Sequence, residues 1–327
     1  MTRSVAIIGA GQIGYAASDA FLWNDWDVTV YARTRPDWLQ RDVRFEQHVL
    51  GENPAPEADV VLDTIAFDED DIARYDPEKI GRLIVISSAS VYCDDQGRTL
   101  DEAAQNGFPE FDGPITEDQS TVAPGPETYS TRKVRMENKA REMFGDRATT
   151  LRPCAIHGLW SRHLREWWFV KRLIDGRTHI PLANRGESRF HTTSARMIGE
   201  FAVHAADHSL GGIVNLGDED APSVLQIGQS IAALFGQESE WIPVEGYPDS
   251  AIGRTPWSVP LPFLVSSEKA RASGFTGIHT YADSTHAGLF HLRDDPPHDW
   301  RATFPQLAAY PWDLFDYDAE DRFLASL

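Results

Sequence analysis

Tyr129 and Lys133 are the residues of this 327-residue sequence whose types and spacing most directly suggest proton-transfer chemistry. Residues four apart lie on one face of an α-helix, and the sequence of Thr128–Phe144 predicts a helix. A tyrosine hydroxyl has an ordinary pKa of about 10, and a nearby ammonium group favours the phenolate and lowers that pKa. The pair therefore indicates a tyrosine that exchanges a proton with a substrate oxygen, as interconversion of a carbonyl and a secondary alcohol requires.

A second pair, Tyr75 and Lys79, has the same spacing in a different context. Pro77 lies between the two residues and is unfavourable inside a helix that would carry both side chains. No serine-bearing strand end precedes this pair either. We interpret it as a chance match, which shows that the spacing alone is insufficient.

Ser88 follows the apolar run Leu83–Ser87, which is typical of a strand. Ligands of doubly wound sheets bind beyond the carboxyl ends of the strands, so a hydroxyl here would face the cofactor crevice. It could orient a substrate carbonyl and stabilise charge that develops on the oxygen. Ser90, two residues further on, is a weaker candidate for substrate contact. Ordinary turn chemistry is the alternative explanation for both serines.

The segment from Gly9 to Gly14 has the glycine spacing of a dinucleotide-binding turn. Gly9 permits a tight turn after the first strand, Gly11 lets the backbone approach a pyrophosphate, and Gly14 allows close packing of helix on strand. The positive end of the helix would then face the pyrophosphate, with Gln12 and Ile13 in its first turn. A plain turn is the alternative, and the position between a strand and a helix favours the dinucleotide.

The end of the second strand indicates which dinucleotide binds. NAD sites usually carry Asp or Glu there to accept a hydrogen bond from the ribose 2′-hydroxyl. This sequence instead has Arg33 and Arg35, and a guanidinium group can bind a 2′-phosphate with two hydrogen bonds. We therefore expect NADP(H) to be preferred, with NAD(H) possible, and a solvated loop arginine is the alternative for each residue.

The order of apolar runs and helical patterns predicts an α/β fold with a Rossmann-type doubly wound parallel sheet. Residues 93–127 read as a long loop, and residues 245–262, rich in Pro and Gly, as a segment that runs over the surface. Strands are expected at Val5–Ile8, Val28–Tyr31, Val60–Ile65, Leu83–Ser87, Thr149–Leu151 and Gly212–Leu216, and helices at Ile13–Trp23, Thr128–Phe144, Leu164–Asp175, Ala195–Ala206 and Val224–Phe235.

Four motifs together resemble the extended short-chain dehydrogenase/reductase family, also described as NAD(P)-dependent epimerases and dehydratases. They are GAGQIG at 9–14, SSASVY at 87–92, YSTRK at 129–133 and LRP at 151–153. The resemblance implies that Ser88, Tyr129 and Lys133 are the catalytic triad and that Pro153 contacts the nicotinamide. Lys133 could also hold the nicotinamide ribose. His157 and His191 fall in segments that contribute to the family's substrate pocket, but each could equally be a core or surface histidine.

The resemblance also implies an NAD(P)-binding Rossmann domain over residues 1–155. Residues 156–327 would form mainly a smaller C-terminal substrate domain, interleaved with late Rossmann elements. Three features depart from the family pattern. The glycine motif is one residue shorter than in most extended members, as in atypical ones. The loop between Ser88 and Tyr129 is long, which suggests a lid or a modified pocket. Ala155 stands where sugar-nucleotide epimerases usually carry Asn.

Composition narrows the class of protein. The formal net charge is -20, from 50 acidic and 30 basic residues, which argues against nucleic acid as a partner. Two cysteines are too few for a disulfide framework or a structural zinc site, and the histidines form no metal-ligand motif, so no metal is expected. The sequence has no signal-peptide pattern and no apolar run of about 18 residues, so we expect a cytoplasmic protein that does not span a membrane.

These features lead to one functional hypothesis and two alternatives. We expect an NADP(H)-dependent oxidoreductase that interconverts a carbonyl and a secondary alcohol on a small molecule, acting as a monomer or homodimer. The first alternative is a nucleotide-sugar epimerase or dehydratase that retains its NAD(P). The second is a non-catalytic NADP-binding regulator, which would need the glycine turn but not Tyr129.

Overall fold

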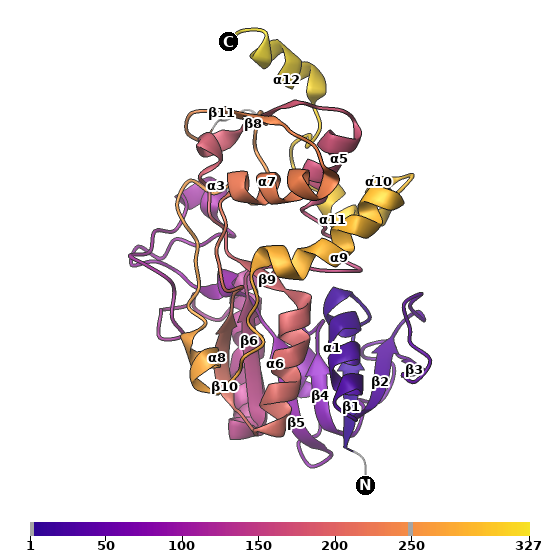
Figure 1. The fold of residues 1–327 in the computed structure, drawn as a ribbon. Helices are drawn as coiled ribbons and strands as arrows, with labels where there is room; N and C mark the ends of the chain where they lie inside the picture. The colour runs from indigo at the N-terminus through magenta and orange to yellow at the C-terminus, as the bar shows by residue number, and fades with distance from the viewer. Residues whose placement is uncertain (1–2, 248–250) are drawn as a thin grey trace.

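Seven parallel strands form one sheet in the lower half of the molecule (Figure 1). The computed structural model describes residues 3–247 and 251–327. The strand order is β10-β6-β5-β4-β1-β2-β3. The chain adds β2 and β3 on one side of β1 and then adds β4, β5, β6 and β10 on the other side, which confirms the doubly wound α/β fold. The strands are β1 (Ser4–Ile8), β2 (Asp27–Ala32), β3 (Arg44–Gln47), β4 (Ala58–Asp63), β5 (Ile80–Ile86), β6 (Ala148–Pro153) and β10 (Gly212–Leu216).

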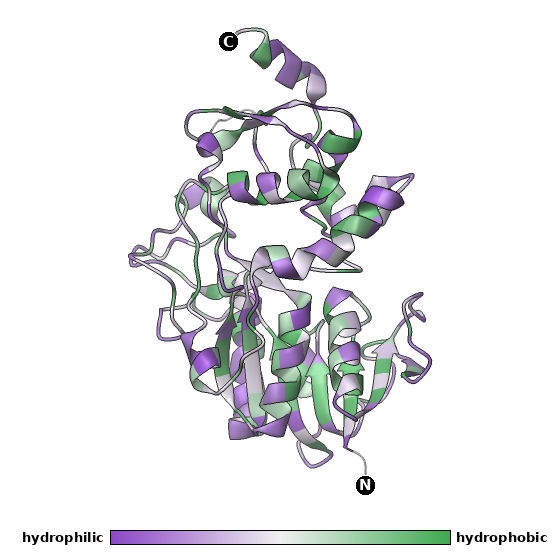
Figure 2. Cartoon of the chain, viewed as in Figure 1, coloured by the Kyte–Doolittle hydropathy of each residue, from purple (hydrophilic) through white to green (hydrophobic). Residues whose placement is uncertain are grey.

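The central strands are apolar on both faces because helices cover both. Val5 and Ile7 of β1 belong to one hydrophobic cluster, whereas Ala6 and Ile8 belong to another, and none is more than 2% exposed. Figure 2 shows the hydrophobic colour along these central strands. A strand buried on both faces carries a continuous apolar run, which explains why these strands could be predicted.

Helices α1 (Gln12–Trp23) and α6 (Ala195–Asp207) pack together on one face of the sheet, and α2 (Glu69–Ala73) and α4 (Tyr129–Phe144) pack together on the other. The backbones of α1 and α6 approach closely, because a Cβ on Gly199 would lie 2.7 Å from the Ala16 carbonyl oxygen. Both α6 and β10 come after residue 155 in the sequence, yet they belong to the Rossmann sheet and its helical layer. The division at residue 155 itself stays a prediction.

A second hydrophobic core lies in the upper half of the molecule (Figure 1). It includes Trp168 and Phe169, whose rings lie 4.8 Å apart and are fully buried. Two short parallel sheets accompany it, β8 with β11 and β7 with β9. The remaining elements are β7 (Ala155–His157), β8 (His179–Leu182), β9 (Thr192–Ser194), β11 (Glu240–Pro243), α3 (Ala103–Asn106), α5 (Trp167–Ile174), α7 (Val224–Phe235), α8 (Glu268–Ala272), α9 (Tyr281–Asp294), α10 (Trp300–Thr303), α11 (Pro305–Ala308) and α12 (Tyr317–Leu324).

The structure also contains elements that the sequence pattern did not predict, among them α9 and the short helix α3 inside the expected loop of residues 93–127. Strand β3 was not expected, because it is a short edge strand whose polar side chains lack an apolar pattern. The expectation that residues 245–262 run over the surface is wrong for part of the described segment. Trp257 is 1% exposed and stacks on Phe169 with 6.3 Å between the ring centroids, so the hydrophobic effect draws this Pro-rich segment into the core. Residues 248–250 of that segment lie outside the described residues.

Candidate active site

The glycine turn between β1 and α1 has a conformation that only glycine tolerates. Gly9 has a φ of +106°, and a Cβ there would lie 2.3 Å from Thr64 Oγ1. A Cβ on Gly14 would lie 2.1 Å from the Gly9 carbonyl oxygen, so α1 packs directly on the turn. At Gly11, by contrast, no described atom lies within 4 Å of the Cβ position. The backbone is therefore closely packed at Gly9 and Gly14, and it is accessible to a ligand at Gly11.

The residues around this turn fit a dinucleotide pyrophosphate. Gly11 is the N-cap of α1 and has no side chain to cap the helix, so the first N–H groups remain available to an anion. Gln12 Oε1 is buried and has no hydrogen-bond partner among residues 3–247 and 251–327. Trp38 Nε1 donates a hydrogen bond to the Ala10 carbonyl at 3.1 Å and so helps to fix the conformation of the turn.

Arg33 and Arg35 lie immediately beyond β2, and both side chains are exposed. The Arg35 guanidinium lies 5.9 Å from the centre of the Phe45 ring on β3, and the Arg33 carbonyl accepts a hydrogen bond from Gln47 Nε2 at 3.1 Å. In the part of the chain that the structure describes, neither guanidinium forms an ion pair. The arrangement is compatible with a 2′-phosphate, and the cofactor preference stays a prediction.

The three predicted catalytic residues come from two neighbouring segments. Ser88 follows the end of β5, and Tyr129 and Lys133 lie in the first two turns of α4. Thr128 caps α4, because its Oγ1 accepts a hydrogen bond from Thr131 N at 3.2 Å, and this fixes Tyr129 in the first turn. Lys133 Nζ lies 5.6 Å from the centre of the Tyr129 ring, and Ser88 lies close enough to the Tyr129 hydroxyl to lower its pKa in part. Ser88 Oγ also accepts from Ser90 N at 3.1 Å.

Lys133 links α4 to the end of β5 and to the segment that follows β4. Its ammonium group donates to the Ala66 carbonyl at 2.6 Å and to the Ile86 carbonyl at 2.9 Å. The side chain is 6% exposed, and burial lowers its pKa to about 8 although the charges of Asp63 and Glu137 act in the opposite direction. Burial of an ammonium group is costly, and the two carbonyl oxygens offset part of that cost.

Tyr129 is not the acidic phenol that the spacing suggested. Burial of its hydroxyl raises the pKa to about 12, the neighbouring Ser88 hydroxyl lowers it only in part, and the charge of Asp101 raises it further. The pKa is raised rather than lowered mainly because the hydroxyl is buried, and the Lys133 ammonium donates to two backbone carbonyls instead of to the phenol. The hydroxyl is therefore protonated at neutral pH and can donate its proton, while the side chain as a whole stays 42% exposed.

Asp101 is a site residue that the sequence did not reveal. It comes from the long loop of residues 93–127, and its Oδ2 accepts a hydrogen bond from Ser130 N at 2.8 Å. Ser130 Oγ in turn donates to Ser90 Oγ at 2.9 Å, so Ser90 is held against α4. The loop thus brings a negative charge to the catalytic helix, and no local sequence pattern marks this residue.

Pro153, His157 and His191 lie beyond the triad. Pro153 ends β6 and is buried. His157 Nε2 pairs with Asp218 Oδ2 at 2.7 Å, and this carboxylate raises the pKa of the imidazole although burial acts to lower it. His191 is hydrogen-bonded to the Asp218 carbonyl at 2.9 Å and to Val265 N at 3.2 Å. Both imidazoles therefore belong to a buried network around Asp218, and among the described residues neither is bonded to Ser88 or Tyr129.

Tyr75 and Lys79 do not form a second site. Helix α2 ends at Ala73, the Tyr75 hydroxyl donates to Asp63 Oδ2 at 2.6 Å, and Lys79 Nζ is bonded to Glu57 Oε1 at 2.7 Å. The two side chains therefore have separate partners.

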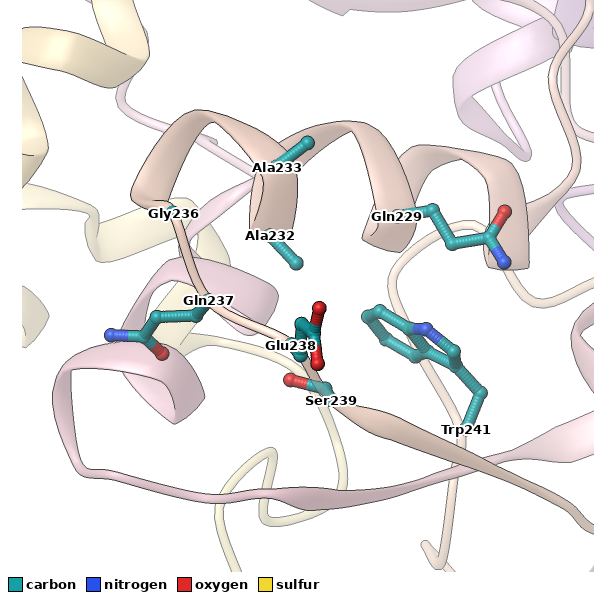
Figure 3. A pocket seen from close by; sticks show the side chains of 8 residues that line it. All are labelled: Gln229, Ala232, Ala233, Gly236, Gln237, Glu238, Ser239 and Trp241. Atoms are coloured by element: carbon teal, nitrogen blue, oxygen red, sulfur yellow. The ribbon is translucent and has the colours of Figure 1, made fainter.

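A hollow of about 580 Å³ lies between α7 and β11, in the upper half of the molecule and not at the glycine turn. Figure 3 shows Ala232 pointing from α7 toward the hollow and Trp241 facing it from β11.

No helix of residues 3–247 and 251–327 has the length and apolar character needed to cross a membrane. Within the same residues, no group of three or more His, Cys, Asp or Glu side chains could hold a metal ion.

Comparison with solved structures places this geometry in a known fold. The chain is similar to UDP-N-acetylglucosamine 4-epimerase from Bacillus cereus, with 14% identity, a TM-score of 0.63, and coverage of 89% of this chain and 100% of that one. It is similar to dTDP-glucose 4,6-dehydratase from Bacillus anthracis in complex with NAD, with 13% identity, a TM-score of 0.64, and coverage of 91% and 98%. The corresponding values for UDP-glucose 4-epimerase from Thermus thermophilus in complex with NAD are 15%, 0.62, 89% and 99%.

No protein-family model matches the chain, and no curated protein matches it by sequence. At these identities the structural similarity establishes the fold. The chain therefore has the fold of the extended short-chain dehydrogenases/reductases, as the sequence motifs predicted.

Proposed function

We propose that this chain is an NADP(H)-dependent oxidoreductase that interconverts a carbonyl and a secondary alcohol on a small molecule. The observation that carries the proposal is the position of the Tyr129 hydroxyl. Ser88 lies close enough to this hydroxyl to lower its pKa, and Lys133 follows Tyr129 by one helical turn. Ser88 comes just after β5, whose carboxyl end lies at the same edge of the parallel sheet as the end of β1, where the glycine turn begins. Acid–base chemistry at a substrate oxygen needs a proton donor and a second polar group at that oxygen, and both are present.

Each residue of the triad has a distinct task in this proposal. Tyr129 carries its proton at neutral pH and donates it to a carbonyl oxygen, which suits reduction. Ser88 holds the same oxygen by a second hydrogen bond and stabilises the charge that develops on it. Lys133 keeps α4 fixed to the segment that follows β4 and to the end of β5 through the Ala66 and Ile86 carbonyls. Bound NADPH would supply the hydride.

The proposed cofactor-binding residues are the glycine turn (Gly9, Gly11, Gln12, Ile13 and Gly14), Arg33, Arg35, Lys133 and Pro153. The open space at Gly11 and the uncapped start of α1 support pyrophosphate binding. The exposed guanidinium groups of Arg33 and Arg35 support a preference for NADP(H) over NAD(H).

The direct test is turnover of NADPH by the purified protein with a panel of prochiral ketones, followed by the loss of NADPH absorbance. Molecules that co-purify with the protein, identified by mass spectrometry, would guide the choice of panel. Stereospecific alcohol formation is the expected result. Tight NADPH binding without turnover of any carbonyl or nucleotide sugar would favour a non-catalytic regulator instead.

Epimerisation or dehydration of a nucleotide sugar is a second candidate, because solved structures of this fold carry those names. Such an enzyme uses the same triad but regenerates its cofactor, so no net turnover of dinucleotide occurs. Ala155 weakens this candidate, since sugar-nucleotide epimerases usually carry Asn there. A dinucleotide that stays bound through gel filtration, together with conversion of a UDP-sugar observed by NMR, would favour this candidate over the oxidoreductase.

A further inference from the structure

A buried carboxylate lies directly behind the triad and is not part of it. Glu137 is on α4, one turn after Lys133, and is 5% exposed. Its Oε1 accepts hydrogen bonds from Ser87 Oγ at 2.5 Å and from Arg152 Nε at 2.9 Å, and its Oε2 accepts from Arg152 Nη2 at 2.6 Å. The two Arg152 bonds form a bidentate pair, which fixes the direction of the carboxylate as well as its distance.

The partners of Glu137 are sequence neighbours of predicted site residues. Ser87 immediately precedes Ser88, and Arg152 immediately precedes Pro153. The strands that carry them are adjacent, because Ser87 N donates to the Leu151 carbonyl at 2.7 Å. The Glu137 carboxylate therefore links helix α4 to the ends of β5 and β6. These three segments carry Lys133, Ser88 and Pro153, respectively.

The same network continues into the long loop of residues 93–127. The Arg152 guanidinium lies 4.7 Å from the centre of the Tyr92 ring. The Tyr92 hydroxyl donates to Asn215 Oδ1 at 2.7 Å, and Asn215 Nδ2 donates to the Ile115 carbonyl at 3.0 Å. Groups from α4, the ends of β5 and β6, β10 and the loop thus form one continuous chain of buried contacts.

Stability alone does not account for a charged group in this place. A buried ion pair gains little over apolar side chains of the same volume, because desolvation of both charges offsets their attraction. Glu137 also falls on the inward stripe of α4, between Val134 and Ala140, where an apolar residue would pack well. The geometry points to a role in orientation, since the hydrogen bonds constrain directions that apolar packing leaves free.

We propose that Glu137 is a positioning residue, which holds Ser88, Lys133 and Pro153 in register through Ser87, the helix α4 and Arg152. This inference rests on the proposed function of the triad. Displacement of reacting groups by about 1 Å can lower a rate about 100-fold, so loss of the carboxylate affects the chemical step more than the binding of dinucleotide.

The test compares Glu137→Gln with a matched control, Glu320→Gln. Glu320, on α12, is 3% exposed and forms a buried ion pair with Arg172 of α5, and both helices lie in the upper half of the molecule (Figure 1). Both substitutions remove one buried carboxylate charge opposite an arginine. We expect Glu137→Gln to lower kcat by about 10- to 100-fold with the Kd for NADPH within about twofold, and Glu320→Gln to lower thermal stability with kcat unchanged. Equal effects of the two variants on kcat would overturn the proposal.

A second measurement does not depend on turnover. The chain has only five lysines, so Lys133 can be followed by NMR with isotope-labelled lysine. The Glu137 charge raises the pKa of Lys133, so Glu137→Gln should lower that pKa below its value of about 8, and Glu320→Gln should leave it unchanged. An unaltered Lys133 pKa in Glu137→Gln would show that the Glu137 charge does not act on Lys133 and would contradict the proposed position of the carboxylate behind the triad. The Lys133 pKa can be measured even if the wild-type protein reduces no carbonyl. Such a lack of turnover would count against the proposed function but not against the position of Glu137.

Ser87→Ala provides the same test if Glu137→Gln does not fold. It removes one hydrogen bond and leaves the Glu137–Arg152 pair intact. A fall in kcat of about threefold or more at unchanged NADPH affinity is expected. A wild-type kcat in a folded Ser87→Ala protein would show that the link from Glu137 to Ser88 is without effect.

Discussion

Lys133 should make the stability of this protein depend on pH in a way that a variant lacking the amine does not. Burial lowers the pKa of the folded protein's Lys133 from 10.5 to about 8. Below pH 8 the amine is charged in the folded and the unfolded chain, and the cost of burying the charge is fully present. Between pH 8 and 10.5 the unfolded chain keeps this proton and the folded chain does not, so stability rises with pH.

The magnitude follows from the two pKa values. At about 1.4 kcal/mol for each pH unit of difference, Lys133 destabilises the folded state by about 3 kcal/mol at neutral pH. Replacement by Met removes this contribution, and it also leaves the Ala66 and Ile86 carbonyls without a donor, at a cost that does not change with pH. All other titrating groups are shared by the two proteins.

The assay is urea unfolding of the wild-type protein and of Lys133→Met at several pH values between 7 and 10.5. We expect the unfolding free energy of the wild-type protein, minus that of the variant, to increase by about 3 kcal/mol from pH 7 to pH 10.5. A difference between the two proteins that is constant with pH would refute the assignment of Lys133 as a buried ammonium with a lowered pKa. Lys139→Met serves as a control, because Lys139 pairs with Glu142 at the surface.

Three further predictions concern the cofactor site and the acidity of Tyr129. Arg33→Ala should weaken NADPH binding by about 10-fold or more and NADH binding by less than about twofold, measured by fluorescence titration, because a charge-assisted hydrogen bond to the 2′-phosphate is lost; equal losses would contradict the NADP preference. Gly11→Ala should fold with an unchanged Tm but lose dinucleotide, because its Cβ enters open space, whereas Gly14→Ala should lose about 1–3 kcal/mol of stability because its Cβ would lie 2.1 Å from the Gly9 oxygen; the reverse pattern would argue against the turn as described. Asp101→Asn should lower the pKa of Tyr129 and so shift the pH profile of alcohol oxidation to lower pH, since the carboxylate raises that pKa; an unshifted profile would remove Asp101 from the site.

The sheet, the glycine turn and the position of the triad could be predicted because each depends on local pattern. β1 carries a continuous apolar run, Gly9 and Gly14 sit where packing forbids a Cβ, and Tyr129 and Lys133 are one helical turn apart. Each feature leaves a pattern in neighbouring residues, although the atom that forbids a Cβ at Gly9, Thr64 Oγ1, comes from a distant segment. The structure confirms the fold class for this reason.

The acidity of Tyr129 could not be predicted, because it depends on burial and on Asp101, which a long loop brings to the helix from elsewhere in the sequence. The same holds for His157, whose partner Asp218 is 61 residues away. The role of Glu137 had a weak signal, since a carboxylate on the inward stripe of a helix requires a buried partner. That partner, Arg152, lies on another strand, so spacing along the helix could not identify it.

The central claim is that the Tyr129 hydroxyl moves the proton, and removal of that single oxygen tests it most directly. Single-turnover reduction of an accepted carbonyl by bound NADPH should be at least about 100-fold slower in Tyr129→Phe than in the wild-type protein, with unchanged NADPH affinity. Tyr75→Phe, which removes a buried hydroxyl bonded to Asp63, should keep the wild-type rate. A near-wild-type rate in Tyr129→Phe, or loss of the rate in Tyr75→Phe alone, would contradict the account.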